Sequence, residues 1–280
     1  MKKKILLLLS ITIVIILISI IAGVIIFNRS IINVKLPHRA VLHVLPASKG
    51  NHAHSAIIIC PGGGYRYLER WSEGYMWFPY FHLRGYTVAM LEYKMPKLDH
   101  QSPMTDAADA IRLMRQRAAE WNYDVNSVGI MGFSAGGHVA STLIVSNDST
   151  SRPDFGILFY PVVSMKKELT HKGSHDHLLG ENASEQLENQ YSNELHVSDH
   201  TPPVYIAVAS NDVKVNPENS LRFYDAMCAK DRPVTLHVYP SFVHGWGYQL
   251  TFDHHGKMLE DLAEWLNKRH QLDTLNIKYE

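Results

Sequence analysis

Gly132-Phe133-Ser134-Ala135-Gly136 is a G-x-S-x-G pentapeptide that stands between two segments with different patterns. The apolar run at residues 128–131 before it is typical of a buried strand, and residues 137–145 after it are typical of a helix packed on one side. A sharp turn from strand to helix strains the serine backbone and exposes its Oγ at the top of a sheet. Ser134 is therefore the candidate nucleophile, and a serine buried in an ordinary turn is the alternative.

Two later loops carry the partners that such a serine needs. Asp212 follows a predicted strand at residues 204–209, and His244 follows another at residues 234–239. A histidine must take the serine proton, and a carboxylate must orient that histidine. Both residues come just after strand ends, and serine, acid and histidine occur in the hydrolase order. We predict a catalytic triad; a helix-capping Asp212 and a structural His244 are the alternatives.

A glycine-rich loop provides the fourth element. Residues 57–60 predict a strand that leads, through Pro61, into three consecutive glycines at 62–64. Bare backbone there can direct its N–H groups at a reacting carbonyl oxygen. We predict an oxyanion hole made by Gly63, Gly64 and the N–H of Ala135. The alternatives are a flexible turn or a phosphate loop, but no Gly-Lys-Ser/Thr sequence follows.

On these motifs the chain resembles the α/β-hydrolase fold serine esterases, in particular the bacterial acetyl-xylan-esterase-like and related lipase/esterase branch. The resemblance extends from about Ala56 to about Leu266. It rests on residues 60–65, 132–138, 160–161, 212, 218–220 and 244–247. It implies a mostly parallel central sheet with helices on both faces, and hydrolysis of short-chain, above all acetyl, esters.

The chain departs from that family pattern at two places. Pro61 stands where the lipase branch usually has histidine, which affects how the glycine loop is anchored. Asn211 and Asn216 stand where relatives often have a second acid and a proline. Asp212 is therefore the only acid candidate on its loop.

The remaining pattern alternates strands and helices, which predicts one α/β domain. Further strands are expected at residues 40–45, 86–93 and 155–160, and helices at residues 106–121, 219–230 and 254–270. The segment at residues 165–200 is polar and irregular, so we expect a cap or lid over the site.

The N-terminus has a separate character. The three lysines at positions 2–4 precede an uncharged apolar run at residues 5–27, which is longer than the roughly 20 residues that cross a bilayer. We expect residues 1–30 to form a membrane anchor and residues 31–280 to form the catalytic domain outside the cytoplasm. Secretion after cleavage of a signal segment is the alternative.

Composition narrows the function classes. The formal net charge is +0, so nothing favours a nucleic-acid partner. The 17 histidines are mostly scattered and lack a spacing such as H-E-x-x-H, so we expect neither a metal nor another cofactor. Cys60 and Cys228 are interpreted as small buried hydrophobes rather than a disulfide.

These observations predict a serine carboxylic-ester hydrolase that acts on small-molecule or carbohydrate esters. The alternatives are a serine peptidase of the same fold, or a non-catalytic, anchored binding protein on a hydrolase scaffold. Tyr65 and Trp246 are the candidate substrate-pocket residues, with core packing as the alternative for both. Tyr65, Tyr67 and Trp71 are expected to restrict the acyl side to short chains. Glu73 is expected to be a charge at the start of a helix, with contact to the substrate as the alternative.

Overall fold

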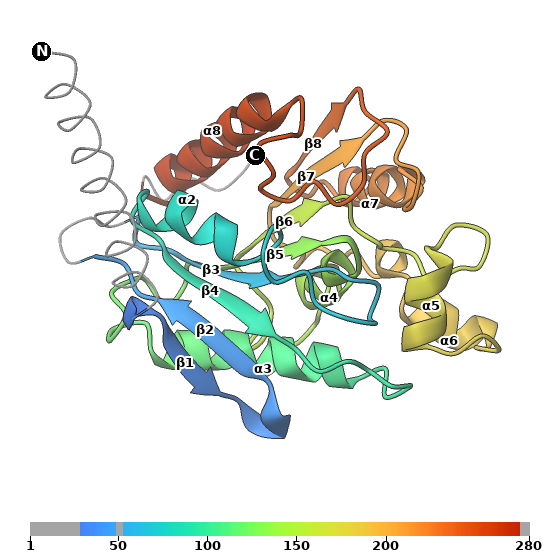
Figure 1. Ribbon diagram of the computed structural model, residues 1–280, viewed down its shortest axis with the longest axis horizontal. Coiled ribbons are helices and arrows are strands. Elements are labelled where there is room, and N and C mark those ends of the chain that lie inside the picture. The colour runs from blue at the N-terminus through green and yellow to red at the C-terminus, as the bar shows by residue number, and fades with distance from the viewer. Residues whose placement is uncertain (1–28, 49–52, 275–280) are drawn as a thin grey trace, which may run out of the picture.

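The computed structural model describes residues 29–48 and 53–274 of the chain. In these ranges an eight-stranded sheet lies between layers of helices (Figure 1). None of the helices in the same ranges is long and apolar enough to cross a membrane. The predicted membrane segment at residues 5–27 lies outside the described residues.

The sheet is mostly parallel, as the sequence predicted. Its strands are β1 (Ile32–Lys35), β2 (Val41–Leu45), β3 (Ala56–Cys60), β4 (Thr87–Glu92), β5 (Val128–Phe133), β6 (Phe155–Phe159), β7 (Val204–Ala209) and β8 (Val234–Tyr239). They lie in the order β1-β2-β4-β3-β5-β6-β7-β8. β2 pairs antiparallel with β1 and with β4, and the other pairs are parallel. The edge strand β1 was not predicted.

Helices cover both faces of the sheet, which confirms the predicted layers. They are α2 (Phe78–His82), α3 (Ser102–Gln116), α4 (Ser134–Ile144), α5 (Lys172–Leu178), α6 (Glu185–Gln190), α7 (Glu218–Cys228) and α8 (His255–Thr274), with short 3-10 turns η1 (Pro37–Arg39), η2 (Tyr75–Trp77) and η3 (Asn193–Leu195). α3 begins at Ser102 rather than at Asp106, because Pro103 suits a first helical turn.

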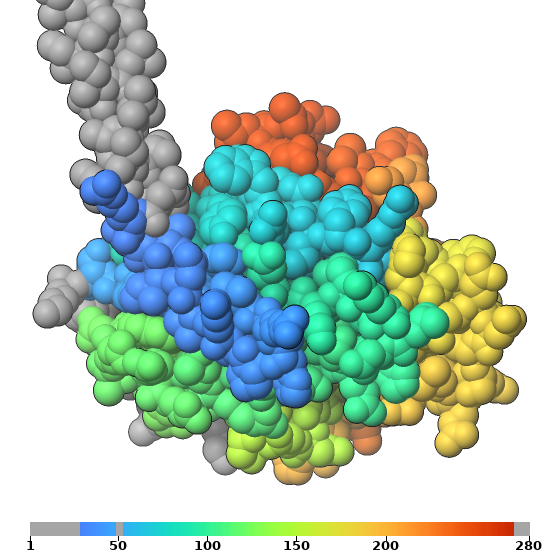
Figure 2. Space-filling view, turned by 60° about the horizontal axis from the view of Figure 1, so that its bottom comes forward, coloured from blue at the N-terminus to red at the C-terminus, as the bar shows by residue number. Residues whose placement is uncertain are grey.

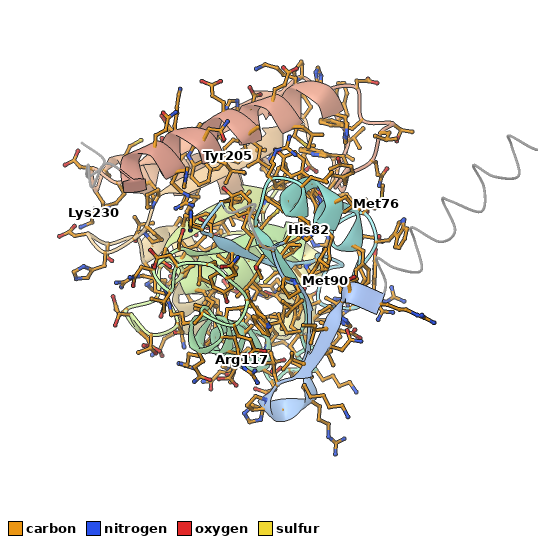
Figure 3. The ribbon with its side chains drawn as sticks, turned by 90° about the vertical axis from the view of Figure 1, so that its left-hand side faces the viewer. Met76, His82, Met90, Arg117, Tyr205 and Lys230 are labelled. Atoms are coloured by element: carbon orange, nitrogen blue, oxygen red, sulfur yellow. The ribbon has the colours of Figure 1, made fainter. Side chains whose placement is uncertain are left out.

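The core consists of two apolar layers, one on each face. On β3, Ile58 packs in the layer with α3, α4 and α7, whereas its neighbours Ile57 and Ile59 pack in the layer with α2 and α8. Figure 3 shows side chains filling both layers, with Met90 and Tyr205 fully buried in the second one. Burial on both faces explains why inner parallel strands such as β3 and β7 are continuous apolar runs.

The carboxyl ends of the parallel strands converge on one side of the sheet. The glycine loop follows β3, Ser134 follows β5, Tyr160 follows β6, Asp212 follows β7 and His244 follows β8. The segment with α5, α6 and η3 is inserted between β6 and β7 at this same side, and it projects at one end of the molecule (Figures 1 and 2). The fold thus brings residues from five loops together.

Candidate active site

The turn around Ser134 has the geometry that the pentapeptide predicts. β5 ends at Phe133, α4 begins at Ser134, and the φ angle of Ser134 is +50°. Such a positive φ is strained for a residue with a side chain. A Cβ on Gly132 would lie 2.3 Å from the carbonyl oxygen of Gly136, and one on Gly136 would lie 2.1 Å from that of Cys60. Both flanking glycines are therefore needed for the tight turn.

The three predicted triad side chains form a continuous hydrogen-bonded series. Nδ1 of His244 lies 2.7 Å from Oδ2 of Asp212, and Nε2 lies 2.9 Å from Oγ of Ser134. The buried carboxylate can only accept, so Nδ1–H donates to it, and Nε2 accepts from the serine hydroxyl. Oδ1 of Asp212 also accepts the backbone N–H groups of Lys214 and Val215. Asp212 thus shapes the turn before α7 as well as orienting the histidine.

The predicted oxyanion-hole residues lie beside the serine. Gly63 and Gly64 have φ angles of +122° and +63°, which favour glycine. A Cβ on Gly63 would also lie 2.2 Å from the carbonyl oxygen of Tyr67. Both glycines line the same cleft as Ser134. Ala135 is in the first turn of α4, where helix N–H groups lack intrahelical partners, so a bound oxyanion can accept from it.

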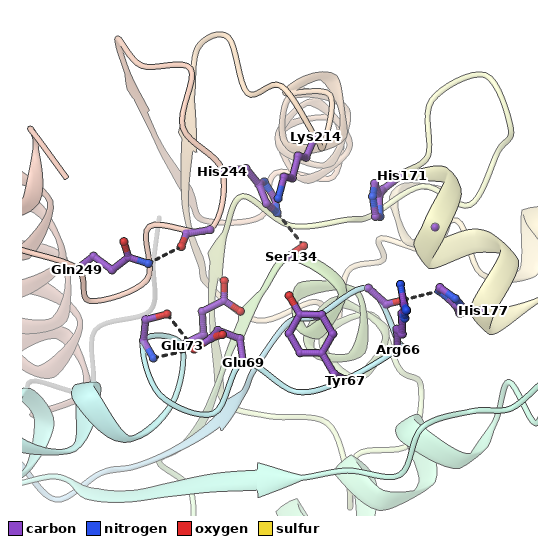
Figure 4. Close-up of a pocket in the computed structure, with 15 residues that line it drawn as sticks. Arg66, Tyr67, Glu69, Glu73, Ser134, His171, His177, Lys214, His244 and Gln249 are labelled. Carbon is purple, nitrogen blue, oxygen red and sulfur yellow. Dashed lines mark hydrogen bonds between the residues drawn. The ribbon is translucent and has the colours of Figure 1, made fainter. Parts of the chain in front are cut away.

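The cleft above Ser134 has a volume of about 590 Å³, and most side chains on its wall are charged or polar (Figure 4). Arg66 and His171 lie on one side of Ser134, and Glu69 and Glu73 lie on the other. The wall residues are Gly63, Gly64, Arg66, Tyr67, Glu69, Ser72, Glu73, Ser134, His171, Gly173, His177, Lys214, His244, Gly245 and Gln249. The predicted cap segment therefore contributes one wall of the cleft, through the residues in and next to α5.

The two predicted substrate-pocket residues, Tyr65 and Trp246, do not lie on this wall. Tyr65 is 2% exposed, and its hydroxyl donates to Nδ1 of His138 at 2.7 Å. Trp246 is 1% exposed; its ring stacks on Phe252, and its N–H contacts the sulfur of Met258. Both predictions were wrong because each loop turns its aromatic ring into the core.

Glu73, expected to be a helix-start charge, is instead a buried residue of the cleft wall. Glu73 precedes η2 in the sequence, and the residue is 3% exposed. Oε2 accepts the N–H of Gly62 at 2.8 Å, and Oε1 accepts the hydroxyl of Tyr160 at 2.9 Å. Burial raises the pKa of Glu73 from 4.5 to about 7, against the opposing effect of these two hydrogen bonds. The sequence signal was weak, because Glu73 is one of two glutamates in an aromatic stretch and nothing in the pattern distinguishes it from Glu69.

His138 links the nucleophile helix to the inserted segment. Its Nε2 donates to the carbonyl oxygen of Tyr191 at 2.8 Å, so Nδ1 is the acceptor for Tyr65. Burial lowers the pKa of His138 from 6.5 to about 4, so the ring is neutral near pH 7. This histidine therefore supports α4 from behind and does not face the cleft.

The remaining histidines and cysteines can be placed in the described part of the chain. There, no group of three or more His, Cys, Asp or Glu side chains could hold a metal ion. Cys60 is buried, as predicted, but Cys228 is exposed at the end of α7. The prediction for Cys228 was wrong because its position falls on the solvent side of the helix.

Comparison with known proteins shows the family to which the chain belongs. The BD-FAE family profile matches residues 42–227. The chain is 36% identical to an acetylxylan esterase of Xylanibacter ruminicola over 77% of this chain and 46% of that protein, and 34% identical to endo-1,4-beta-xylanase B of Butyrivibrio fibrisolvens over 68% and 32%. It thus spans less than half the length of either curated relative.

Solved structures support the same assignment. An acetyl ester-xyloside bifunctional hydrolase from Caldicellulosiruptor lactoaceticus superposes with a TM-score of 0.72 at 33% identity, over 81% of this chain and 89% of that one. A sugar hydrolase from Lactococcus lactis has the same fold, with a TM-score of 0.75 at 23% identity over 86% and 98%. The predicted α/β-hydrolase fold and the family resemblance are confirmed, and the chain belongs to the BD-FAE family.

Proposed function

We propose that this chain is a serine carboxylic-ester hydrolase that cleaves short-chain, above all acetyl, esters on carbohydrate. The observation that carries the proposal is the hydrogen-bonded series from Ser134 through His244 to Asp212 at the floor of an open cleft. A nucleophile, a base and an orienting acid in this geometry are sufficient for acyl transfer. The series requires no cofactor.

In the proposed reaction, Oγ of Ser134 attacks the ester carbonyl carbon while its proton passes to Nε2 of His244. The carbonyl oxygen becomes an oxyanion that accepts from the N–H groups of Gly63, Gly64 and Ala135, and one such donor is worth roughly 3–4 kcal/mol in comparable sites. The alcohol then leaves with the proton from His244. Water repeats the attack on the acyl-enzyme and releases the acid.

The cleft wall supports a polar substrate with a small acyl group. Tyr67 lies on the wall and is largely exposed, whereas Trp71 is exposed and lies outside the wall residues. The expected enclosure of the acyl group by aromatic rings is therefore missing. The preference for short acyl chains needs a different physical reason. Most wall side chains are charged or polar, so a long acyl chain would gain little of the ~0.8 kcal/mol that burial of each methylene can supply. Acetylated xylan is the favoured natural substrate because one relative is named an acetylxylan esterase and another an acetyl ester-xyloside bifunctional hydrolase.

A hydrolysis panel tests this proposal. We expect kcat/KM to fall from p-nitrophenyl acetate through butyrate to octanoate, acetylated xylan to release acetate, and peptide p-nitroanilides to remain uncleaved. Ser134→Ala is the control for background hydrolysis. A rate that rises towards octanoate, or that jumps at a lipid–water interface, would move the protein to the lipases, and cleavage of peptide amides would favour the peptidase alternative.

For residues 1–30 we keep the membrane anchor as a proposal. Its support is the apolar run at residues 5–27 behind three lysines. In this arrangement the catalytic domain faces the outside of the cytoplasmic membrane, where polysaccharide is available. Fractionation of cells that express the full chain tests this: we expect the protein in the membrane fraction at full length, whereas a shortened form in the medium would support signal cleavage.

A further inference from the structure

The buried carboxylate of Glu73 connects three loops of the site. Oε2 accepts the N–H of Gly62, the residue before the oxyanion glycines, and Oε1 accepts the hydroxyl of Tyr160 at the end of β6. Oη of Tyr160 in turn accepts the N–H of Gly247, on the loop that carries His244. Figure 4 shows the carboxylate on the cleft wall beside Ser134.

Close packing leaves this carboxylate little freedom to move. A Cβ on Gly62 would lie 2.7 Å from Oε2 of Glu73 and 2.9 Å from Cβ of Ser134, so both side chains lie against the same glycine. A Cβ on Gly247 would lie 2.4 Å from the carbonyl oxygen of Ser72. The backbone beside Glu73 is therefore in direct contact with the histidine loop, and the oxyanion loop contacts the carboxylate itself.

We propose that Glu73 is a positioning residue for ester hydrolysis at Ser134, because its carboxylate fixes the oxyanion loop relative to the loop that carries His244. The inference rests on the proposed function. An error of about 1 Å in the placement of reacting groups can cost about 100-fold in rate. The carboxylate bonds to the oxyanion loop directly and to the histidine loop through Tyr160, so this link can set the distance between the oxyanion donors and the general base.

The ionised form of Glu73 is the form that fits these contacts. Each carboxylate oxygen faces a donor, so a proton on Oε2 would oppose the N–H of Gly62, and one on Oε1 would oppose the hydroxyl of Tyr160. Burial dominates the pKa of Glu73 and raises it to about 7; among the titratable groups around it, Tyr160 and His244 lower this pKa and Glu69 raises it. Acidification below neutrality therefore weakens the link between the loops.

Three variants test the positioning role. Glu73→Gln, Tyr160→Phe and the double variant are assayed with p-nitrophenyl acetate. We expect each single change to lower kcat roughly 10- to 100-fold, as for a displaced oxyanion donor, with KM changed less than about threefold. The kcat of the double variant should lie within about threefold of the kcat of the slower single variant, because both changes break the same link.

Tyr239→Phe is the matched control. It removes another buried hydrogen bond between a tyrosine and an acid, from Tyr239 to Asp261, outside the cleft wall. We expect it to retain kcat within about threefold. Equal losses of kcat in the control and in Tyr160→Phe would reduce the effect to general destabilisation and overturn the proposal. A wild-type kcat in Glu73→Gln would also overturn it. The same holds if the loss of kcat in the double variant equals the product of the losses in the two single variants.

The pH profile adds a readout that needs only the unchanged protein. Protonation of Glu73 should add a step to the acid limb of kcat/KM, which should therefore fall by more than tenfold per pH unit. Glu73→Gln should reduce this to a limiting slope of about tenfold per unit. If the acid limb of the wild-type kcat/KM profile showed a single protonation, the proposal would be overturned even if every variant failed to fold. Activity retained in Ser134→Ala would instead overturn the proposed function.

Discussion

At the scale of single residues, Ser134 combines a strained backbone with a small contribution to packing. We expect Ser134→Ala to lower ester hydrolysis by at least about 10⁴-fold, since only the oxyanion hole and substrate binding remain. The free energy of unfolding should change by less than about 1.5 kcal/mol, because the variant loses one hydrogen bond, to His244. Esterase assays and urea unfolding measure the two effects. Wild-type-like turnover would contradict the assignment of the nucleophile.

Glu73 gives a second prediction at this scale, for stability instead of rate. Its pKa is raised by burial from 4.5 to about 7, so between these values the native state binds more protons than the unfolded state. Its contribution to stability therefore falls as the pH rises. We expect the unfolding free energy of Glu73→Gln, relative to wild type, to increase by about 2.5 kcal/mol from pH ~5 to pH ~8. A pH-independent difference in urea unfolding would show that the carboxyl titrates normally.

At the scale of elements, α4 depends on a contact with the segment between β6 and β7. His138 donates to the carbonyl oxygen of Tyr191 in that segment. Burial lowers its pKa from 6.5 to about 4, so the native state binds fewer protons between these values and loses stability as the pH falls through them. We expect about 3 kcal/mol to be lost over this window.

His138→Gln tests this contact, because glutamine cannot titrate there. We expect the variant to be less stable than wild type at neutral pH but to lose about 3 kcal/mol less between pH ~6.5 and pH ~4. Urea unfolding across this window is the measurement. If the two proteins lost stability in parallel, the acid sensitivity would have to come from other groups.

The elements also show what the sequence could predict. The parallel strands were found because burial on both faces produces continuous apolar runs, and the pentapeptide located the turn at Ser134 because the glycines around it cannot be replaced without overlap. Boundaries were less certain: α3 begins and ends earlier than its apolar pattern predicted. The edge strand β1 has an exposed, irregular pattern that gave no signal.

At the scale of the whole molecule, the order of residues along the chain predicted the triad, because a parallel sheet brings the ends of successive strands to one side. The direction in which each loop side chain points could not be predicted in the same way. Tyr65 and Trp246 point into the core and Glu73 points into the cleft wall, and long-range packing decides each direction. The contact between Glu73 and Tyr160 joins residues 87 positions apart, so no local pattern encodes it.

The same scale supports a prediction about the N-terminal segment. Every cleft-wall residue follows β3, and β1, the first strand, begins at Ile32 and completes the edge of the sheet. We expect a chain that starts at Arg29 to keep β1, to fold, and to hydrolyse p-nitrophenyl acetate with kcat within about twofold of the full chain in detergent. The Tm values of the two proteins should also agree within about 3 °C. A larger shift would correspond to a change of more than roughly 1 kcal/mol in the unfolding free energy of a domain of this size. A folded but inactive truncated protein, beside an active full chain, would show that residues 1–28 contribute to the site.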